Sequence, residues 1–145
     1  MKRSITIDPE DDFKNTFSKV LKVGDNVYVS AMMADHLDEN PSFSEQTHSI
    51  LNKINDYLKT IKLDLSYVVK VQVYGTDKLN LEALDDIFKM YFKNPYPARD
   101  VAIVDHLAEE NASIQISLEA IDYRASELMK QWENQICEDG VCEYI

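Results

Sequence analysis

Arg99 is the side chain whose position in the sequence most suggests chemistry. It follows residues 94–98, Asn-Pro-Tyr-Pro-Ala, in which two prolines restrict the backbone just before an apolar run at 101–104. A guanidinium group presents a rigid fork of donors that matches a carboxylate or a phosphate, and it stays charged at any working pH. Two interpretations remain open, an anion-binding arginine and a surface arginine paired with one of the 26 acidic side chains, and the local sequence alone favours the second.

Glu119 is a second candidate, because it lies in the middle of an alternating, strand-like segment. A carboxylate in such a place can orient a water molecule or bind a cation, as carboxylates at active sites do. The simpler interpretation, which is favoured, is that alternation puts Glu119 on a polar strand face with Gln115 and Ser117.

The histidines and cysteines show no spacing typical of metal ligands. His36, His48 and His106 are far apart in the sequence, and no histidine lies near Cys137 and Cys142. There is also no Gly-rich phosphate loop and no Gly-x-Ser-x-Gly motif. The sequence therefore predicts no metal and no cofactor, and it favours two reduced thiols over a disulfide.

Composition limits the class of partner. A chain of 145 residues is about one ordinary domain, and its net charge of −11 repels phosphate backbones and anionic lipid headgroups. We therefore expect no nucleic-acid and no membrane partner. No apolar run approaches the roughly 18 residues of a membrane span, and the N-terminus turns acidic before a signal peptide can form. The expected compartment is the cytoplasm.

Hydrophobic periodicity predicts an α+β domain over residues 1–124, followed by a C-terminal helical tail over residues 125–145. Ser42 and Glu45 stand in capping-box register before the first helix, and Asn80 is a plausible N-cap for the second. The run at 101–104 is read as a buried strand. The predicted elements are strands at 17–21, 27–31, 68–76, 98–104 and 114–121, helices at 43–62 and 81–93, and a tail helix carrying Leu128, Met129, Trp132 and Ile136.

The order of these elements also predicts how they pack. Strand 68–76, helix 81–93 and strand 98–104 form a crossover unit, which makes the two strands parallel. Two helices packed on one face leave the other face of the sheet without cover. Association of subunits covers such a face, so we expect an oligomer.

The chain resembles the Rid family of reactive intermediate deaminases, also called YjgF-type or endoribonuclease L-PSP-like proteins. The resemblance runs from about Phe17 to Arg124 and depends on short motifs in a fixed order. These motifs are Phe17-Ser18-Lys19, Val23-Gly24-Asp25, Val27-Tyr28-Val29-Ser30, Glu45-Gln46-Thr47, Val68-Val69-Lys70, Thr76-Asp77, Tyr91-Phe92, Pro97-Ala98-Arg99 and Glu119-Ala120-Ile121.

The resemblance implies a fold, an assembly and a reaction. The fold is chorismate-mutase-like, a mixed sheet of about six strands with two helices on one face, and the assembly is a homotrimer with ligand sites between subunits. Active members hydrolyse 2-imino acids to 2-keto acids and ammonia without a metal or organic cofactor. The arginine that matches Arg99 holds the substrate carboxylate, so Arg99 is the implied catalytic residue.

The residues implied to bind substrate beside Arg99 depart from the pattern of active members. Phe17 replaces a tyrosine, Ser-Ala-Met replaces Ser-Gly-Gln, an aspartate replaces an asparagine, and a serine replaces the glutamate proposed to place water. The implied substrate-binding positions are Phe17, Ser30, Ala31, Met32, Asp85, Ser117 and Glu119, the last of which matches a second family glutamate.

Three functions remain open at this level. The first is an imine deaminase whose cleft is made more apolar by Phe17, Ala31 and Met32, and which therefore favours a larger hydrophobic side chain on the imino acid. The second is a catalytically inactive trimer that binds a small carboxylate or senses a metabolite. The third is a structural role in which the tail around Trp132 docks on its own trimer or on a partner.

Overall fold

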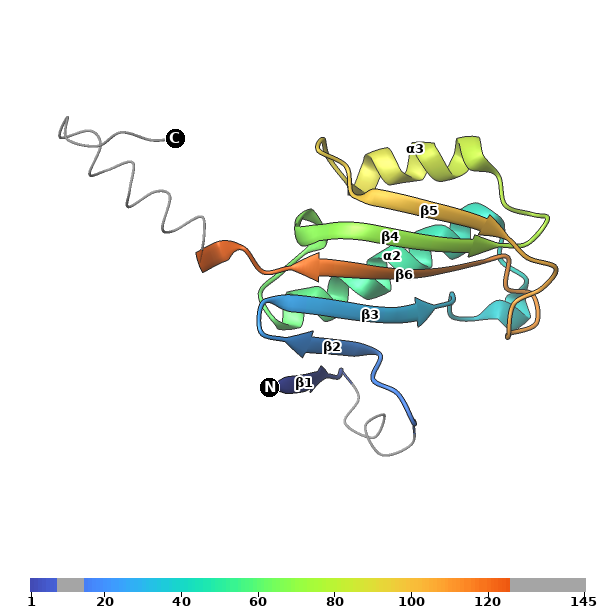
Figure 1. Cartoon of the computed structure of the whole chain (residues 1–145). Helices are drawn as coiled ribbons and strands as arrows, with labels where there is room; N and C mark the ends of the chain where they lie inside the picture. Colours follow the sequence, from blue (N-terminus) through green and yellow to red (C-terminus); the bar gives the residue numbers. More distant parts are fainter. Residues whose placement is uncertain (8–14, 126–145) are drawn as a thin grey trace, which may run out of the picture.

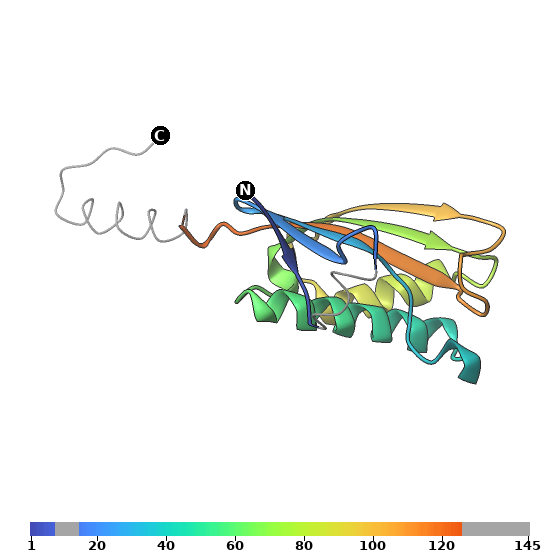
Figure 2. The ribbon, with the colours of Figure 1, turned by 90° about the horizontal axis from the view of Figure 1, so that it is seen from below.

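The computed structural model of the chain describes residues 1–7 and 15–125, and these form one mixed sheet with two helices on one of its faces (Figures 1 and 2). The strand order is β1-β2-β3-β6-β4-β5. The elements are β1 (Lys2–Ile5), β2 (Val20–Val23), β3 (Asn26–Met32), α2 (Phe43–Thr60), β4 (Val68–Gly75), α3 (Leu81–Tyr91), β5 (Ala98–Ile103) and β6 (Ile114–Ile121), with short 3₁₀ turns η1 (Leu37–Glu39) and η2 (Leu65–Tyr67).

The two helices predicted within the domain and the predicted fold class are confirmed. α2 begins with the expected capping box, in which the Ser42 hydroxyl accepts a hydrogen bond from the Glu45 amide at 3.1 Å. The side chain of Asn80 caps α3 by accepting from the Ala83 amide at 3.1 Å. β4 and β5 are parallel, as the crossover through α3 requires.

Two strands differ from the prediction at the N-terminal edge of the sheet. The hairpin partner of β3 begins at Val20 rather than at residue 17, and β1 was not predicted at all. β1 pairs antiparallel with β2 through only four residues, two of them charged and exposed. A short edge strand of this kind carries almost no hydrophobic alternation, so the sequence gives little signal for it.

The prediction that residues 101–104 form a buried strand is wrong. β5 is an edge strand that pairs only with β4, and Ile103 at its end is 61% exposed. A short apolar run does not distinguish a central strand from an edge strand, because both read as a few consecutive apolar residues. On β5, Val101 packs against the core, whereas Ala102 and Ile103 are exposed.

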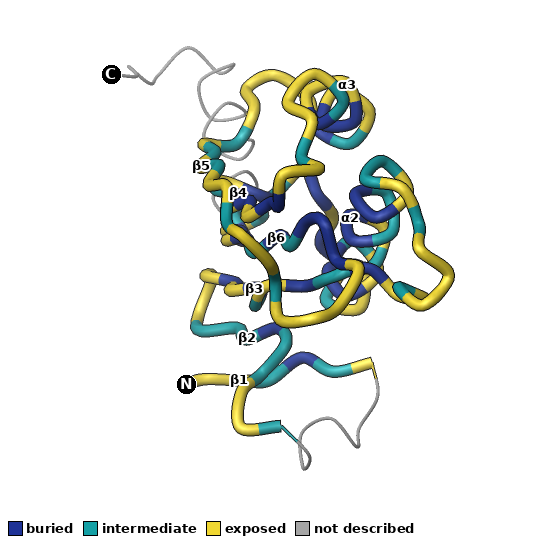
Figure 3. The backbone as a smooth tube through the Cα atoms, turned by 90° about the vertical axis from the view of Figure 1, so that its right-hand side faces the viewer, coloured by how far each residue is buried: buried dark blue, intermediate teal, exposed yellow. Residues whose placement is uncertain are grey.

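The core lies between the sheet and the helices, where Figure 3 shows the buried positions gathered. Inward residues of β3, β4 and β6 alternate with outward ones, so one sheet face is apolar and packs on α2 and α3. The outward face still carries three large side chains that are 37–43% exposed, Tyr28, Tyr74 and Ile121.

None of the helices within residues 1–7 and 15–125 is long and apolar enough to cross a membrane. The helical tail predicted over residues 125–145 lies, apart from Ala125, outside the described residues. The domain boundary at residue 124 stays a prediction.

A buried glutamine joins the start of α2 to the loop before β6. Gln46 is 2% exposed. Its amide nitrogen donates to the carbonyl oxygens of Pro41 and Asn111, each at 3.0 Å, and its oxygen accepts from the Ser113 amide at 2.8 Å. One side chain thus satisfies three backbone groups that have no helix or strand partner.

Replacing this glutamine should destabilise the fold. Gln46→Ala leaves the buried Ser113 amide without an acceptor, which costs about 1–3 kcal/mol before the loss of packing is added. Gln72→Ala, at an exposed glutamine on β4, is the matched control and should change the free energy of unfolding little. Urea titrations measure both, and equal effects in the two variants would contradict the role assigned to Gln46.

A buried carboxylate closes the sheet at the end of β6. Asp122 accepts from Arg124 Nη2 at 2.6 Å and Nε at 2.8 Å, and from Lys22 Nζ on β2 at 3.2 Å. The side-chain hydrogen bond from Arg124 is the main reason that the pKa of Asp122 lies well below its usual range, and it outweighs the desolvation that opposes it.

This depressed pKa predicts a pH-dependent contribution to stability. Asp122 stabilises the fold fully above its unfolded-state pKa of about 3.9, and the contribution is lost as the pH falls through its lower folded-state pKa. Asp122→Asn should therefore lower the free energy of unfolding near neutral pH, with a difference from wild type that shrinks in acid. Denaturation at a series of pH values measures this, beside Asp25→Asn at an exposed carboxylate. If the difference in unfolding free energy between wild type and Asp122→Asn stays constant from neutral pH to below about pH 3, the role assigned to Asp122 is wrong.

Candidate functional site

Arg99 lies on β5 opposite Val71 of β4, and its side chain turns toward α3. Nη1 donates to Asp85 Oδ1 at 2.7 Å, and the guanidinium carbon lies 5.2 Å from the centre of the Phe88 ring. Only 27% of the Arg99 side chain is exposed. The arginine thus stands at the border of a pocket of about 230 Å³ lined by Asp85, Phe88, Lys89, Tyr96, Pro97 and Arg99.

The charge of Arg99 has one partner within this pocket, and that partner is accessible to solvent. The Asp85 side chain is 51% exposed, so the ion pair is weak and an external carboxylate can exchange with it. Asp100 does not neutralise Arg99, because successive side chains of a strand point to opposite faces. Asp100 instead pairs with Lys70 Nζ at 3.4 Å.

Ser117 and Glu119 lie on the opposite face of the sheet from Arg99. They line a shallow pocket of about 160 Å³ together with Tyr28, Lys70 and Gln72. The Ser117 hydroxyl donates to Gln72 Oε1 at 3.4 Å. Glu119 alternates with buried Leu118 and Ala120, so it lies on the polar strand face with Gln115 and Ser117 as alternation predicts, and its role stays a prediction.

The other predicted binding residues border a third pocket of about 470 Å³, lined in part by Phe17, Ser30, Ala31 and Met32. Phe17 is 57% exposed, whereas Met32 is 7% exposed and belongs to the core. The Ser30 hydroxyl donates to the Ser18 carbonyl at 2.7 Å. Pairing of β3 with β6 is irregular between Val29 and Met32, which changes the direction of the chain at this point.

Within one chain, the predicted site residues therefore line three different pockets. The structure brings Asp85 to Arg99, Glu119 to Ser117, and Phe17 to the segment 30–32. Sequence reasoning missed Tyr96 and Lys89 as neighbours of Arg99. Tyr96 had a signal, since it lies in the proline-rich segment that delivers the arginine.

Within 1–7 and 15–125, no three His, Cys, Asp or Glu side chains are grouped as ligands of one metal ion would be. The Arg99 pocket itself is lined by two cations, Arg99 and Lys89, the Asp85 carboxylate, two aromatic rings and a proline.

Comparison with known proteins shows to which family the chain is similar. The family model described as endoribonuclease L-PSP matches residues 10–122. A RutC family protein of Buchnera aphidicola is 27% identical over 111 residues, which are 74% of this chain and 86% of that protein. A 2-iminobutanoate/2-iminopropanoate deaminase of the mite Dermatophagoides farinae is 24% identical over 104 residues, covering 69% of this chain and 80% of the relative.

A solved structure agrees with these sequence matches. RidA from an Antarctic Psychrobacter species superposes with a TM-score of 0.66 at 25% identity, over 74% of this chain and 89% of RidA. Fold and sequence together define a YjgF-type α+β protein. The chain belongs to the Rid family, whose model carries the name endoribonuclease L-PSP.

The ion pair at Arg99 predicts the effect of one substitution. Asp85→Asn removes the competing carboxylate and places at this position the asparagine that the family resemblance implies, so Arg99 should bind an added carboxylate more tightly. The gain is up to about fivefold, because an exposed ion pair contributes about 0–1 kcal/mol.

Titration calorimetry with benzoate measures this change in affinity. Asp86→Asn removes the same charge from the neighbouring exposed position of α3 and serves as the control. If both variants bind benzoate alike, Asp85 does not compete for Arg99.

Proposed function

We propose that this protein hydrolyses 2-imino acids to 2-keto acids and ammonia, with the substrate carboxylate held by Arg99. The observation that carries the proposal is the setting of Arg99. Its guanidinium group is largely buried against Phe88, borders a pocket whose lining surface is mainly apolar, and has an exchangeable partner in Asp85. A fixed cation beside apolar walls matches a small molecule with one carboxylate and one hydrophobic side chain.

The relatives support the reaction class. One relative is named 2-iminobutanoate/2-iminopropanoate deaminase and another, from Arabidopsis thaliana, is named Reactive Intermediate Deaminase A. Both names describe deamination, of two 2-imino acids in the first case and of a reactive intermediate in the second. In this proposal Arg99 is the group that holds the substrate carboxylate.

The reaction needs little from the protein beyond orientation. With the carboxylate fixed on Arg99, the imine carbon next to it is held in one place, and a water molecule adds to that carbon to give a carbinolamine. Proton transfer to nitrogen and cleavage of the carbon–nitrogen bond then release ammonia and the keto acid. Backbone donors and the polar groups of Ser30, Ser117 or Glu119 are candidates for orienting the water.

We also propose that the working unit is a homotrimer with its sites between subunits. The predicted binding residues line three pockets of one chain, on different faces, so a site that combines them needs more than one subunit. The open sheet face supports association, because Tyr28, Tyr74 and Ile121 remain 37–43% exposed there.

Cleavage of RNA, which the name of the family model suggests, receives less support. A net charge of −11 opposes approach of a polyanion, and binding to nucleic acid normally depends on neutralising phosphates with Lys and Arg. A small carboxylate has one charge, and Arg99 alone can match it.

The deaminase proposal is tested by an imine hydrolysis assay. An amino-acid oxidase generates imines from a series of amino acids, and semicarbazide traps the imine that remains. The wild-type protein should accelerate imine loss, and Arg99→Ala should lower kcat/KM by about 10- to 100-fold, the value of a hydrogen bond to a charged group.

Arg3→Ala is the matched control, because it removes an equally charged, exposed side chain from β1. It should leave hydrolysis unchanged. No acceleration over buffer for any imine would rule out the deaminase, whereas equal losses in both variants would rule out a specific role for Arg99.

A second candidate is a trimer that binds a carboxylate without catalysis. It is favoured by Ser117, which stands where the resemblance implies a glutamate that places water, and whose hydroxyl hydrogen-bonds Gln72. Binding of a keto acid that depends on Arg99, without imine hydrolysis, would favour this candidate.

A further inference from the structure

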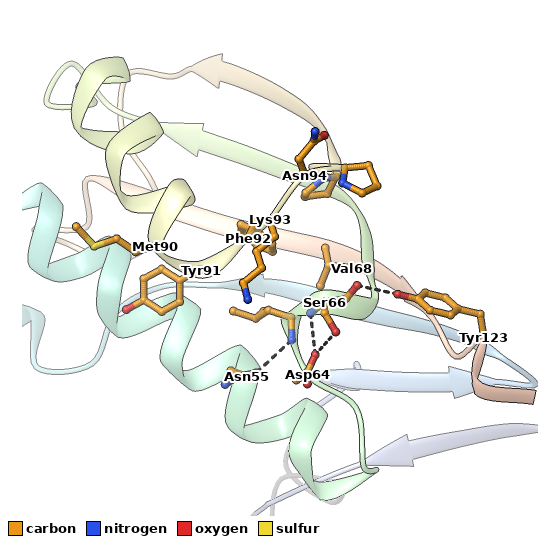
Figure 4. Close-up of a pocket in the computed structure, with 13 residues that line it drawn as sticks. Asn55, Asp64, Ser66, Val68, Met90, Tyr91, Phe92, Lys93, Asn94 and Tyr123 are labelled. Atoms are coloured by element: carbon orange, nitrogen blue, oxygen red, sulfur yellow. Dashed lines mark hydrogen bonds between the residues drawn. The ribbon is translucent and has the colours of Figure 1, made fainter. Parts of the chain in front are cut away.

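A groove of about 690 Å³ lies at the end of the molecule where α3 finishes (Figure 4). Its walls come from the last residues of α3, the segment 92–97 and the region of η2, with Asn55 of α2 and Tyr123 completing it. It is larger than the three pockets described above, and the proposed reaction does not use it.

Several polar groups of the groove bond to one another. Asn55 Oδ1 accepts from the Leu65 amide at 3.2 Å, and the Ser66 amide donates to Asp64 Oδ1 at 2.8 Å. Tyr123 Oη donates to the Ser66 carbonyl at 3.0 Å, as Figure 4 shows. These hydrogen bonds pair part of the polar lining, to which Lys93 and Asn94 also belong.

Its apolar rim, in contrast, is open. Met90 is 71% exposed, although it lies on the same short helix as three buried core residues. Pro95 and Pro97 continue the apolar rim along the loop that leads to β5. Lys93 also lines the groove, and within the described residues it forms no ion pair. The surface fits an apolar segment that brings negative charge.

The chain itself supplies such a segment next to the groove. Tyr123 is part of the groove wall, and the chain continues past Ala125 into residues 126–145, which lie beyond the family match at 10–122. Their sequence has five acidic residues, one lysine and an apolar set at helical spacing: Leu128, Met129, Trp132 and Ile136.

Distance permits the contact. Trp132 is seven residues beyond Ala125. A helical segment of that length spans about 10 Å and an extended one about 23 Å. No long linker has to be closed, so the entropic cost of docking within one chain is small.

We propose that the segment centred on Trp132 packs into this groove of its own subunit, with its apolar side chains on Met90 and the proline rim and its acidic side chains near Lys93. The proposal does not depend on the deaminase reaction.

Fluorescence tests it directly, because Trp132 is the only tryptophan of the chain. In the full-length protein, its emission should be blue-shifted from that of free indole, and acrylamide should quench it poorly. Met90→Glu puts a charge on the rim and should shift the docking equilibrium about tenfold toward the free segment, since a methionine loses its burial. Emission then moves to the red and quenching increases.

Leu81→Glu is the matched control. Leu81 is 54% exposed at the other end of α3, so the variant has the same new charge on the same helix away from the groove. It should keep the wild-type emission. Both altered side chains are exposed, and circular dichroism verifies that each variant is folded.

Three results would overturn the proposal. In the first, Trp132 is fully exposed in the wild-type protein. In the second, it is protected equally in wild type and in Met90→Glu. In the third, its protection disappears on dilution. The second result means that it packs elsewhere, and the third that it packs on another copy.

Discussion

The parallel pairing of β4 with β5 is the constraint on which the candidate site depends. Two neighbouring parallel strands cannot be joined by a tight turn, so the chain between them must return over one face of the sheet. In this protein the returning segment contains α3. That crossover brings Asp85 and Phe88 beneath Arg99, although they are distant from it in the sequence. The proline-rich segment after α3 then fixes where β5 begins. The topology of the β4-α3-β5 crossover therefore holds Arg99 near the Phe88 ring.

The same sheet separates the remaining predicted site residues. Alternation along β6 turns Ser117 and Glu119 away from the helices, while Arg99 turns toward α3, so the polar candidates and the anion clamp lie on opposite faces. One subunit therefore offers binding groups but not one complete pocket. In the proposed homotrimer, association has two effects: it covers the exposed aromatic face and brings separate groups together. The proposed chemistry is then a property of the assembly.

Long, strongly patterned elements could be read from the sequence, and short or edge elements could not. The capping box before α2 and the alternation of β6 are local signals, each contained in a few residues, and both elements form as expected. β1 depends on pairing with β2 across the chain, which no local pattern records. The family resemblance implied a carboxylate site at Arg99. The ion pair with Asp85 joins α3 to β5, however, and depends on tertiary structure that no local pattern in the sequence records. A sequence indicates which side chains are suited to a role more readily than it indicates which of them meet.

Pro97 connects the two surfaces of interest. It lines the Arg99 pocket and also the groove in which we place the segment around Trp132. Because proline has a fixed φ angle and precedes Arg99 by only two residues, any segment that packs on the groove side of the loop limits how far β5 can shift at its start. The role proposed for Arg99 needs such support, since a group that holds a carboxylate loses its effect when its position varies by about an ångström. The residues that follow the family match would then stabilise the loop from the side that substrate does not use.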